Sequence, residues 1–328
     1  MADKYVDIDT LKYLLYDVHE LEELLKRERF VDHDKESLDM FLDSSKDFAD
    51  RELFPYLKEM DENPAFHKDG QVYVHKQVET MMKKGGELGF ISSSFDYEVG
   101  GLQIPLMAST ASSYILDAAN NHLPGYAGLT QGAAELIIHF AKKDLLDKYV
   151  PDMLAGNWGG TMCLTEPQAG SSLSDIVTKA TPHENGYYNI SGQKIFISAG
   201  DNQYLDNIVH LVLARIEGAP KGTRGISLFI VPKNRKLDDG SLEPNDVTSV
   251  ADFQKMGQKG YCTTHLGFGD KDDCRGWLVG EENNGLSCMF VMMNAARIGV
   301  GRAASAIASA AYYASLQYAN ERPQGRKL

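Results

Sequence analysis

The stretch TMCLTEPQAGSS, residues 161–172, lies where a helical sequence pattern gives way to a pattern of strands. Its first residues suit an extended backbone, whose N–H and C=O groups lie free along one edge. Pro167 fixes the turn that follows, and Ala169, Gly170 and Ser171 let a ligand approach the backbone closely. Two interpretations follow: a surface loop between domains, or a strand edge that pairs with a flat heteroaromatic ring within reach of the Thr165 hydroxyl.

On the N-terminal side of this stretch, residues 1–155 are predicted to form a helical domain. Apolar residues recur at helical spacing through residues 7–30 and 34–61, where Asp34 is a candidate N-cap. Further helices are expected within residues 128–156, ending at Pro151 and Gly156.

On the C-terminal side, residues 156–282 are predicted to form a β domain. Short runs rich in branched and aromatic residues are bounded by glycine, proline and charges, and two runs within residues 185–202 are separated by a turn. Asn185-Gly186 is a hairpin signal at the start of this region. The strand spacing favours a small barrel or a sandwich.

From residue 283 the helical period returns, and residues 286–321 are predicted to form one helix about 50 Å long. We expect its apolar stripe to be buried against other helices. Residues 283–328 are thus predicted to supply the first helix of a helical bundle. Either another chain supplies the other helices, or this chain is truncated before them. The stripe consists of Met289, Met292, Met293, Ala296, Gly299, Val300, Ala303, Ile307, Ala310, Ala311, Ala314 and Tyr318.

Composition excludes several classes of protein. The chain has 328 residues and a formal net charge of −13, which argues against a general nucleic-acid surface. Its four cysteines form no CxxC pair, which favours a reducing cytoplasm over a zinc or disulfide framework. No signal peptide or membrane span is predicted.

GVGRAA, residues 299–304, matches a dinucleotide-binding fingerprint. That fingerprint requires a preceding strand, whereas this copy lies inside the long predicted helix. Close helix packing through small residues is therefore preferred.

Several motifs in sequence order resemble the acyl-CoA dehydrogenase family. After TMCLTEPQAGSS come GQKIFISAG (192–200), GISLFIVPK, KMGQKG, LVGEENNGL and the helix beginning ARIGVGRAAS, which leads to the ERPQ segment. The resemblance covers residues 80–328, and the long N-terminus is similar to the bacterial branch that includes methylthiopropanoyl-CoA dehydrogenases. It implies an α+β multidomain fold: an N-terminal helical domain, a central β-barrel and the start of a C-terminal helical bundle.

The resemblance also implies FAD as cofactor and an acyl-CoA thioester as substrate. In this family a proton leaves Cα of the thioester and a hydride passes from Cβ to the flavin. Carried over by motif, Met162, Leu164 and Thr165 would line the flavin, with the Thr165 hydroxyl near its reactive edge. Ser198 would bond the flavin, and Phe196 stands where a tryptophan usually packs on the ring.

The remaining implied contacts lie at the loop tip and beyond the long helix. Gly170 and Ser171 would contact FAD or the CoA moiety, and Ser171 is the candidate substrate contact. Arg322 would reach the FAD pyrophosphate of a neighbouring subunit, which implies a homodimer or homotetramer. Gln168 and Ser172 depart from the usual glycine and aspartate.

No catalytic base is assigned within the chain. The family's glutamate lies far into the C-terminal bundle or, in a minority, directly before an arginine that resembles Arg297, where this chain has Ala296. The base is therefore expected beyond residue 328. Two functions stay open: a dehydrogenase fragment, with an electron-transfer flavoprotein as possible electron acceptor, or a short non-catalytic paralogue that binds flavin or CoA or acts in assembly. A third reading is a helical protein with a β insertion and no cofactor.

Overall fold

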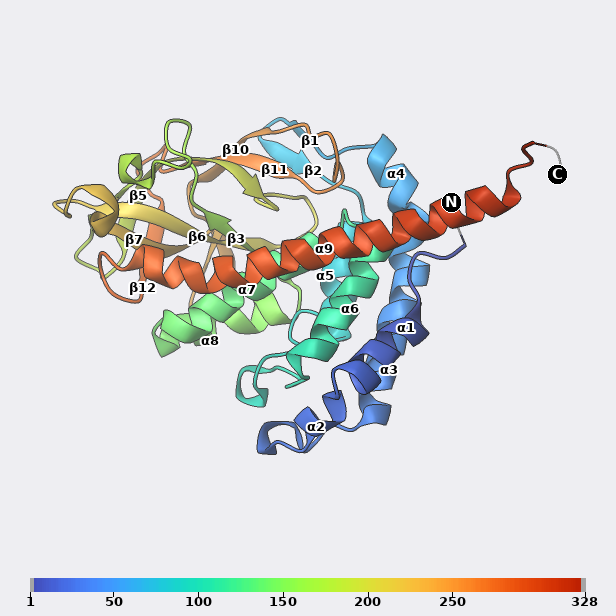
Figure 1. The fold of residues 1–328 in the computed structure, drawn as a ribbon. Helices are drawn as coiled ribbons and strands as arrows, with labels where there is room; N and C mark the ends of the chain where they lie inside the picture. Colours follow the sequence, from blue (N-terminus) through green and yellow to red (C-terminus); the bar gives the residue numbers. More distant parts are fainter. Residues whose placement is uncertain (1–2, 326–328) are drawn as a thin grey trace.

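The computed structural model describes residues 3–325 and has three regions in chain order (Figure 1). A helical region comes first, a β region follows, and a single long helix is the last described element. The first region contains α1 (Ile8–Tyr13), α2 (Leu21–Leu25), α3 (Lys35–Phe48), α4 (Leu57–Glu62), α5 (Gln77–Glu87), α6 (Leu106–Ala119), α7 (Pro124–Phe140), α8 (Lys143–Leu154) and a hairpin of β1 (Phe66–Lys68) and β2 (Gln71–Tyr73).

Two expected helix ends have different outcomes. Asp34 caps α3 as predicted: its side chain accepts from the Ser37 backbone N–H, and the Ser37 side chain accepts from the Asp34 backbone. The prediction that Pro151 ends its helix is wrong, because Pro151 lies inside α8, which continues to Leu154. The chain leaves that helix at Gly156, which has a φ of +76°, and a Cβ there would lie 1.9 Å from the Met82 carbonyl oxygen.

Five strands of the β region close into a ring, which confirms the expected barrel. Along the ring β5 pairs with β12, β12 with β7, β7 with β6, β6 with β4, and β4 with β5. β11 and β10 extend the sheet from β5, and β3 extends it from β6. The strands are β3 (Trp158–Cys163), β4 (Lys179–Pro182), β5 (Tyr188–Ser198), β6 (Asn207–Ile216), β7 (Ile226–Pro232), β8 (Asn234–Lys236), β9 (Leu242–Pro244), β10 (Val247–Asp252), β11 (Thr263–Phe268) and β12 (Arg275–Val279).

The Asn185-Gly186 signal is confirmed as the turn of the β4–β5 hairpin, where Gly186 has a φ of +81°. The turn expected within residues 185–202 is absent, since β5 runs unbroken through Gly192. A Cβ at Gly192 would lie 2.6 Å from the Thr178 hydroxyl oxygen. This glycine therefore lets Thr178 pack directly on the strand.

The last helix, α9 (Gly285–Glu321), crosses the whole molecule in front of α7 and α6 (Figure 1). Part of the predicted stripe is indeed covered, as Met289 and Met292 are buried. Met293, Ala296, Gly299, Ala303 and Ala310 are half-buried, and toward the C-terminal end the covered face shifts around the helix toward Ala306. Burial of the remaining members against further helices stays a prediction. The exposed members of the predicted stripe are Val300, Ile307, Ala311, Ala314 and Tyr318.

GVGRAA lies inside α9, which agrees with the rejection of a dinucleotide site. A Cβ at Gly299 or Gly301 would meet nothing within 4 Å among the described residues, so close packing of these glycines against another helix stays a prediction.

The N-terminal residues lie along the distal half of α9. The Asp3 N–H donates to Gln317 Oε1 at 2.7 Å, and the Lys4 ammonium lies over the Tyr313 ring. The side chains of Tyr5 and Val6 are buried there, and Tyr5 donates to Asp50 at 2.8 Å. The two ends of the described chain are thus packed against each other, and we call this contact the terminal clasp. No helix within residues 3–325 is long and apolar enough to cross a membrane.

Candidate functional site

The TMCLTEPQAGSS stretch comprises the end of β3 and the loop that follows. β3 pairs on one side only, in parallel with β6. On its other edge the Gly160 N–H donates to the Thr130 hydroxyl of α7 at 3.0 Å. Because backbone groups alternate along a strand, Met162 presents its N–H and C=O to this same edge. Within residues 3–325, β3 therefore ends with an edge of backbone donors and acceptors that no other strand pairs.

The loop from Leu164 to Thr178 closes on one buried carboxylate, that of Glu166. Its Oε2 accepts from the Val177 N–H at 2.7 Å and from Gln168 Nε2 at 2.7 Å. Its Oε1 accepts from the Thr178 N–H at 3.1 Å and from the Thr178 hydroxyl at 2.6 Å. Both ends of the loop are therefore tied to the same group.

Lys194 of β5 completes this network beneath the loop. Its ammonium lies 2.8 Å from Glu166 Oε1 and donates to the Leu164 carbonyl at 3.1 Å. Both side chains are buried, with 0% and 1% of the lysine and glutamate side chains exposed. Burial by itself would raise the pKa of Glu166, but the ammonium and the hydrogen-bond donors hold that pKa below its usual value. Burial lowers the pKa of Lys194, and Glu166 opposes this shift.

Phe196 lies at an irregularity two residues along β5. The pairing with β11 shifts there: Lys194 pairs with Leu266, Ile197 pairs with Thr264, and residues 195 and 196 face one residue between them. Phe196 has a φ of +59°, an uncommon conformation for a bulky side chain. Phe196 is 56% exposed, and its ring lies 4.6 Å from the Phe253 ring, centroid to centroid. The bulge thus presents an aromatic face to solvent where alternation alone would not place it.

Ser198 ends the same strand beside two tyrosines. It lies next to the Tyr261 phenol. Burial raises the pKa of Tyr261, and the Ser198 hydroxyl offsets part of this rise. The Tyr261 ring packs edge-on against Tyr126 of α7, and the Tyr126 hydroxyl donates to the Gly260 carbonyl at 3.2 Å. The start of α7, the strand end and the 253–262 loop are joined at this point.

The structure brings most of the predicted site residues together. Met162, Leu164 and Thr165 lie along β3 and its exit, and the Thr165 carbonyl accepts from the Ile195 N–H at 2.9 Å, which connects them to Phe196 and Ser198. Gly170 and Ser171 lie exposed on the loop tip, where a Cβ at Gly170 would meet nothing within 4 Å. Arg322 is separate, since it follows the far end of α9, away from the barrel of its own chain (Figure 1).

Sequence reasoning missed the Glu166–Lys194 pair. The signal was present in the strand pattern: Lys194 is four residues after Ile190, and a period of two places both on one face of β5. A lysine on the apolar face of a strand requires a partner. Glu166, directly before Pro167, is the acidic residue nearest to the β3 exit.

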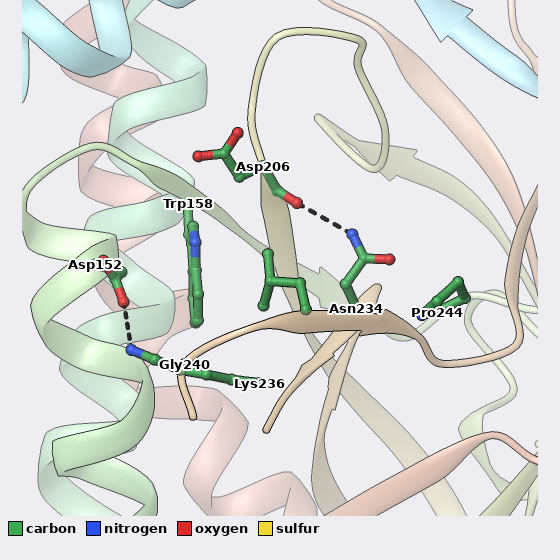
Figure 2. A pocket seen from close by; sticks show the side chains of 8 residues that line it. Asp152, Trp158, Asp206, Asn234, Lys236, Gly240 and Pro244 are labelled. Atoms are coloured by element: carbon green, nitrogen blue, oxygen red, sulfur yellow. Dashed lines mark hydrogen bonds and ion pairs between the residues drawn. The ribbon is translucent and has the colours of Figure 1, made fainter. Parts of the chain in front are cut away.

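A recess of about 620 Å³ lies at the opposite end of β3, beside Trp158 (Figure 2). Two of its polar side chains are already paired: Lys236 lies 2.8 Å from Asp152, and Asn234 donates to the Asp206 carbonyl at 3.0 Å. The candidate site is therefore the open edge, loop and bulge at the C-terminal end of β3.

These residues suit a flat heteroaromatic group with hydrogen-bonding atoms on its rim. The edge of β3 supplies backbone donors and acceptors, Thr165 and Ser198 are half-buried residues that carry hydroxyls, and Phe196 supplies an aromatic face. An isoalloxazine ring has this combination of features, so the donor set fits FAD.

Comparison with known proteins identifies the same stretch. The family model described as acyl-CoA dehydrogenase, middle domain, matches residues 161–270, and the model for the N-terminal domain of that family matches residues 35–157.

Similar proteins extend this result to almost the whole chain. The chain is 38% identical over 262 residues to 3-methylmercaptopropionyl-CoA dehydrogenase of Ruegeria pomeroyi, covering 80% of this chain and 44% of that protein. It is 35% identical over 331 residues to the broad-specificity linear acyl-CoA dehydrogenase FadE5 of Mycobacterium tuberculosis, covering 98% of this chain and 49% of that protein. The chain thus spans less than half the length of these relatives.

The solved structure of butyryl-CoA dehydrogenase from Megasphaera elsdenii superposes with a TM-score of 0.72 at 25% identity. The match covers 90% of this chain and 72% of that one. The helical region, the barrel and the start of the long helix are therefore shared with a solved member of the family.

Proposed function

Because this chain belongs to the acyl-CoA dehydrogenase family, we propose that it supplies a flavin-binding barrel for the FAD-dependent α,β-dehydrogenation of an acyl-CoA thioester. The single observation that carries the proposal is the end of β3, where an open strand edge meets the bulged strand β5. The Thr165 carbonyl accepts from the Ile195 N–H there, which places Thr165 beside the strand that carries Phe196 and Ser198. The bulge presents an exposed aromatic side chain, and among the described residues no strand pairs with the outer edge of β3.

Each side chain has a proposed task toward the flavin. Met162 and Leu164 line one side of the ring, and the Thr165 hydroxyl donates to a ring nitrogen. Phe196 packs against the ring, and the Ser198 hydroxyl holds its rim. When bound, FAD would supply the acceptor for the hydride that leaves Cβ of the substrate.

The loop tip has a proposed role toward the rest of the ligands. Gly170 offers backbone without a side chain, and Ser171 offers a hydroxyl to FAD or to the CoA moiety. Both residues are exposed, and the buried carboxylate of Glu166 fixes the ends of their loop. A rigid loop base with an accessible tip suits a long ligand that extends past the strand edge.

Arg322 is proposed to act on a neighbouring subunit. It follows a helix of 37 residues, about 55 Å long, that begins at the barrel and leads away from it. An arginine at that distance serves a second copy more readily than its own barrel, which supports a homodimer or homotetramer.

The general base is not assigned to a residue of this chain. Ala296 precedes Arg297 on α9 and carries no carboxylate. The base is therefore proposed to lie outside residues 1–328, and an electron-transfer flavoprotein is the proposed electron acceptor. The four free, buried cysteines support a reducing compartment such as the cytoplasm.

The test is flavin retention. The purified chain is incubated with FAD and desalted, and its visible absorption spectrum is recorded. We expect flavin bands to persist, and Thr165→Val to weaken FAD binding about 5- to 10-fold, because a neutral hydrogen bond contributes about 1 kcal/mol. Thr181→Val, an exposed threonine on β4, is the matched control. Loss of the bands from the wild-type chain, or equal effects of both variants, contradicts the proposal.

A second candidate is an assembly module that holds flavin or CoA without catalysis. The exposed apolar face of α9 favours it, since Ile298 is 75% exposed and Val300 is 71% exposed. Intact mass from native cells separates the two. A product well above the 36.3 kDa of this chain excludes a short module.

A further inference from the structure

Glu166 and Lys194 form a buried ion pair, with 1% and 0% of their side chains exposed. Replacing a buried ion pair with apolar side chains of similar volume is often neutral or stabilising, so such a pair is weak evidence for stability. The neighbouring barrel core is apolar, with Ile190, Val212 and Phe229 fully or almost fully buried. An apolar pair at 166 and 194 would be compatible with this environment. The pair must be explained by what it positions.

The positions of the bonded atoms indicate what that is. The Lys194 ammonium donates to the Leu164 carbonyl, so this acceptor points into the barrel and away from the open edge of β3. The Glu166 carboxylate accepts hydrogen bonds from the N–H groups of Val177 and Thr178, just before the chain re-enters the sheet as β4. A backbone bridge between Glu166 and Ala169, 3.0 Å in both directions, fixes the turn between them.

Gly192 provides independent support. Its φ of +153° and the 2.6 Å approach of Thr178 Oγ1 to a Cβ there show that β5 accommodates this threonine. Thr178 in turn gives Glu166 its shortest hydrogen bond, at 2.6 Å. Three separate elements are therefore shaped around one carboxylate.

We propose that Glu166 and Lys194 are positioning residues for the flavin-binding edge. By holding the Leu164 carbonyl inward, they set the direction of the Leu164–Thr165 peptide and of the Thr165 side chain, so that the edge is preorganised before a ligand binds. This inference rests on the proposed flavin site, but the loop order it predicts exists without flavin.

The first test therefore uses no flavin. Hydrogen exchange of the full chain is compared for wild type, Lys194→Met and Ile190→Ala. Ile190→Ala is the matched control, since it removes a buried side chain from the same strand and has no bond to the loop. We expect Lys194→Met to raise exchange at least tenfold in the amides of Val177 and Thr178, with the control unchanged there. Equal protection in Lys194→Met and the control overturns the proposal.

The second test uses FAD as the probe. Titration of each variant should show a Kd at least tenfold higher for Lys194→Met than for Ile190→Ala at a similar loss of melting temperature. If the rise in the FAD Kd of each variant is explained by its loss of melting temperature alone, the positioning role is overturned. A wild-type chain that binds no FAD but shows the exchange pattern refutes the flavin function and leaves the loop order demonstrated.

Thr178→Val is the variant that keeps the test decisive if Lys194→Met does not fold. It retains the side-chain shape and removes one of the donors to Glu166. We expect the same direction in exchange and in FAD affinity, about three- to tenfold. A Thr178→Val chain with wild-type exchange and wild-type FAD affinity overturns the proposal.

Discussion

His210 makes the stability of the barrel depend on pH. It lies on β6 with its side chain fully buried, and its Nδ1 is 2.8 Å from the Thr161 hydroxyl oxygen. No partner for Nε2 is found among the residues that the structure describes. Burial lowers the pKa of His210 from 6.5 to about 3, so the folded protein holds the ring neutral.

The direction in which pH changes the free energy of unfolding follows from proton uptake by the unfolded chain. Between pH 6.5 and pH 3 the unfolded chain protonates this histidine and the folded chain does not. The free energy of unfolding therefore falls as the pH is lowered through this window, by about 1.4 kcal/mol per pH unit. At pH 5 the contribution is about 2 kcal/mol lower than at pH 7.5.

The assay is urea unfolding followed by tryptophan fluorescence at several pH values between 7.5 and 5. His210→Asn should be less stable at neutral pH because it leaves a cavity, but its slope with pH should be smaller than the wild-type slope by about 1.4 kcal/mol per unit. Val212→Ala, buried on the same strand, is the control that should lose stability and keep the full slope. A His210→Asn protein as steeply pH-dependent as the wild type refutes the reasoning.

Three further outcomes are expected. Phe196→Gly should relieve a left-handed backbone worth about 1–2 kcal/mol, so its melting temperature should hold or rise while flavin retention after desalting falls; unchanged retention contradicts the assigned role. Gly160→Ala places a Cβ 2.8 Å from that of Ala133 and should lower the free energy of unfolding by about 1–3 kcal/mol. Gly299→Ala meets nothing within 4 Å and should raise the free energy of unfolding by about 0.5–1 kcal/mol. Thermal unfolding in the reverse order would disprove the packing described for β3 and α9. Arg302→Met removes the partner that lies 3.0 Å from the buried Asp117 and should lower the free energy of unfolding by about 3–5 kcal/mol at pH 7. The loss should be smaller at lower pH, because burial already raises the pKa of Asp117. A loss of stability that is the same at both pH values argues against a buried charge.

Much of the architecture follows from local patterns in the sequence. The Asp34 cap, the hairpin at Asn185-Gly186 and the change of period near residue 156 each depend on a few neighbouring residues. Closure of the barrel was expected from strand spacing and family resemblance, and it arises because β4 pairs with both β5 and β6.

What the sequence could not show depends on contacts between distant residues. The bulge at Phe196 arises from a register shift against β11, which no local pattern encodes. The covered face of α9 drifts because the helix crosses β7, α7 and α6 in turn, so different faces meet different neighbours. The Glu166–Lys194 pair joins residues 28 apart, and only the fold brings them to 2.8 Å.

The terminal clasp has a consequence for the order in which the chain can fold during synthesis. Asp3 is synthesised 314 residues before its partner Gln317. At about 5–20 residues per second, translation takes roughly 15–60 s to reach that partner. Tyr5 and Val6, both buried in the finished protein, lack their cover on α9 throughout this interval. The burial of this segment is therefore complete only after α9 has been synthesised.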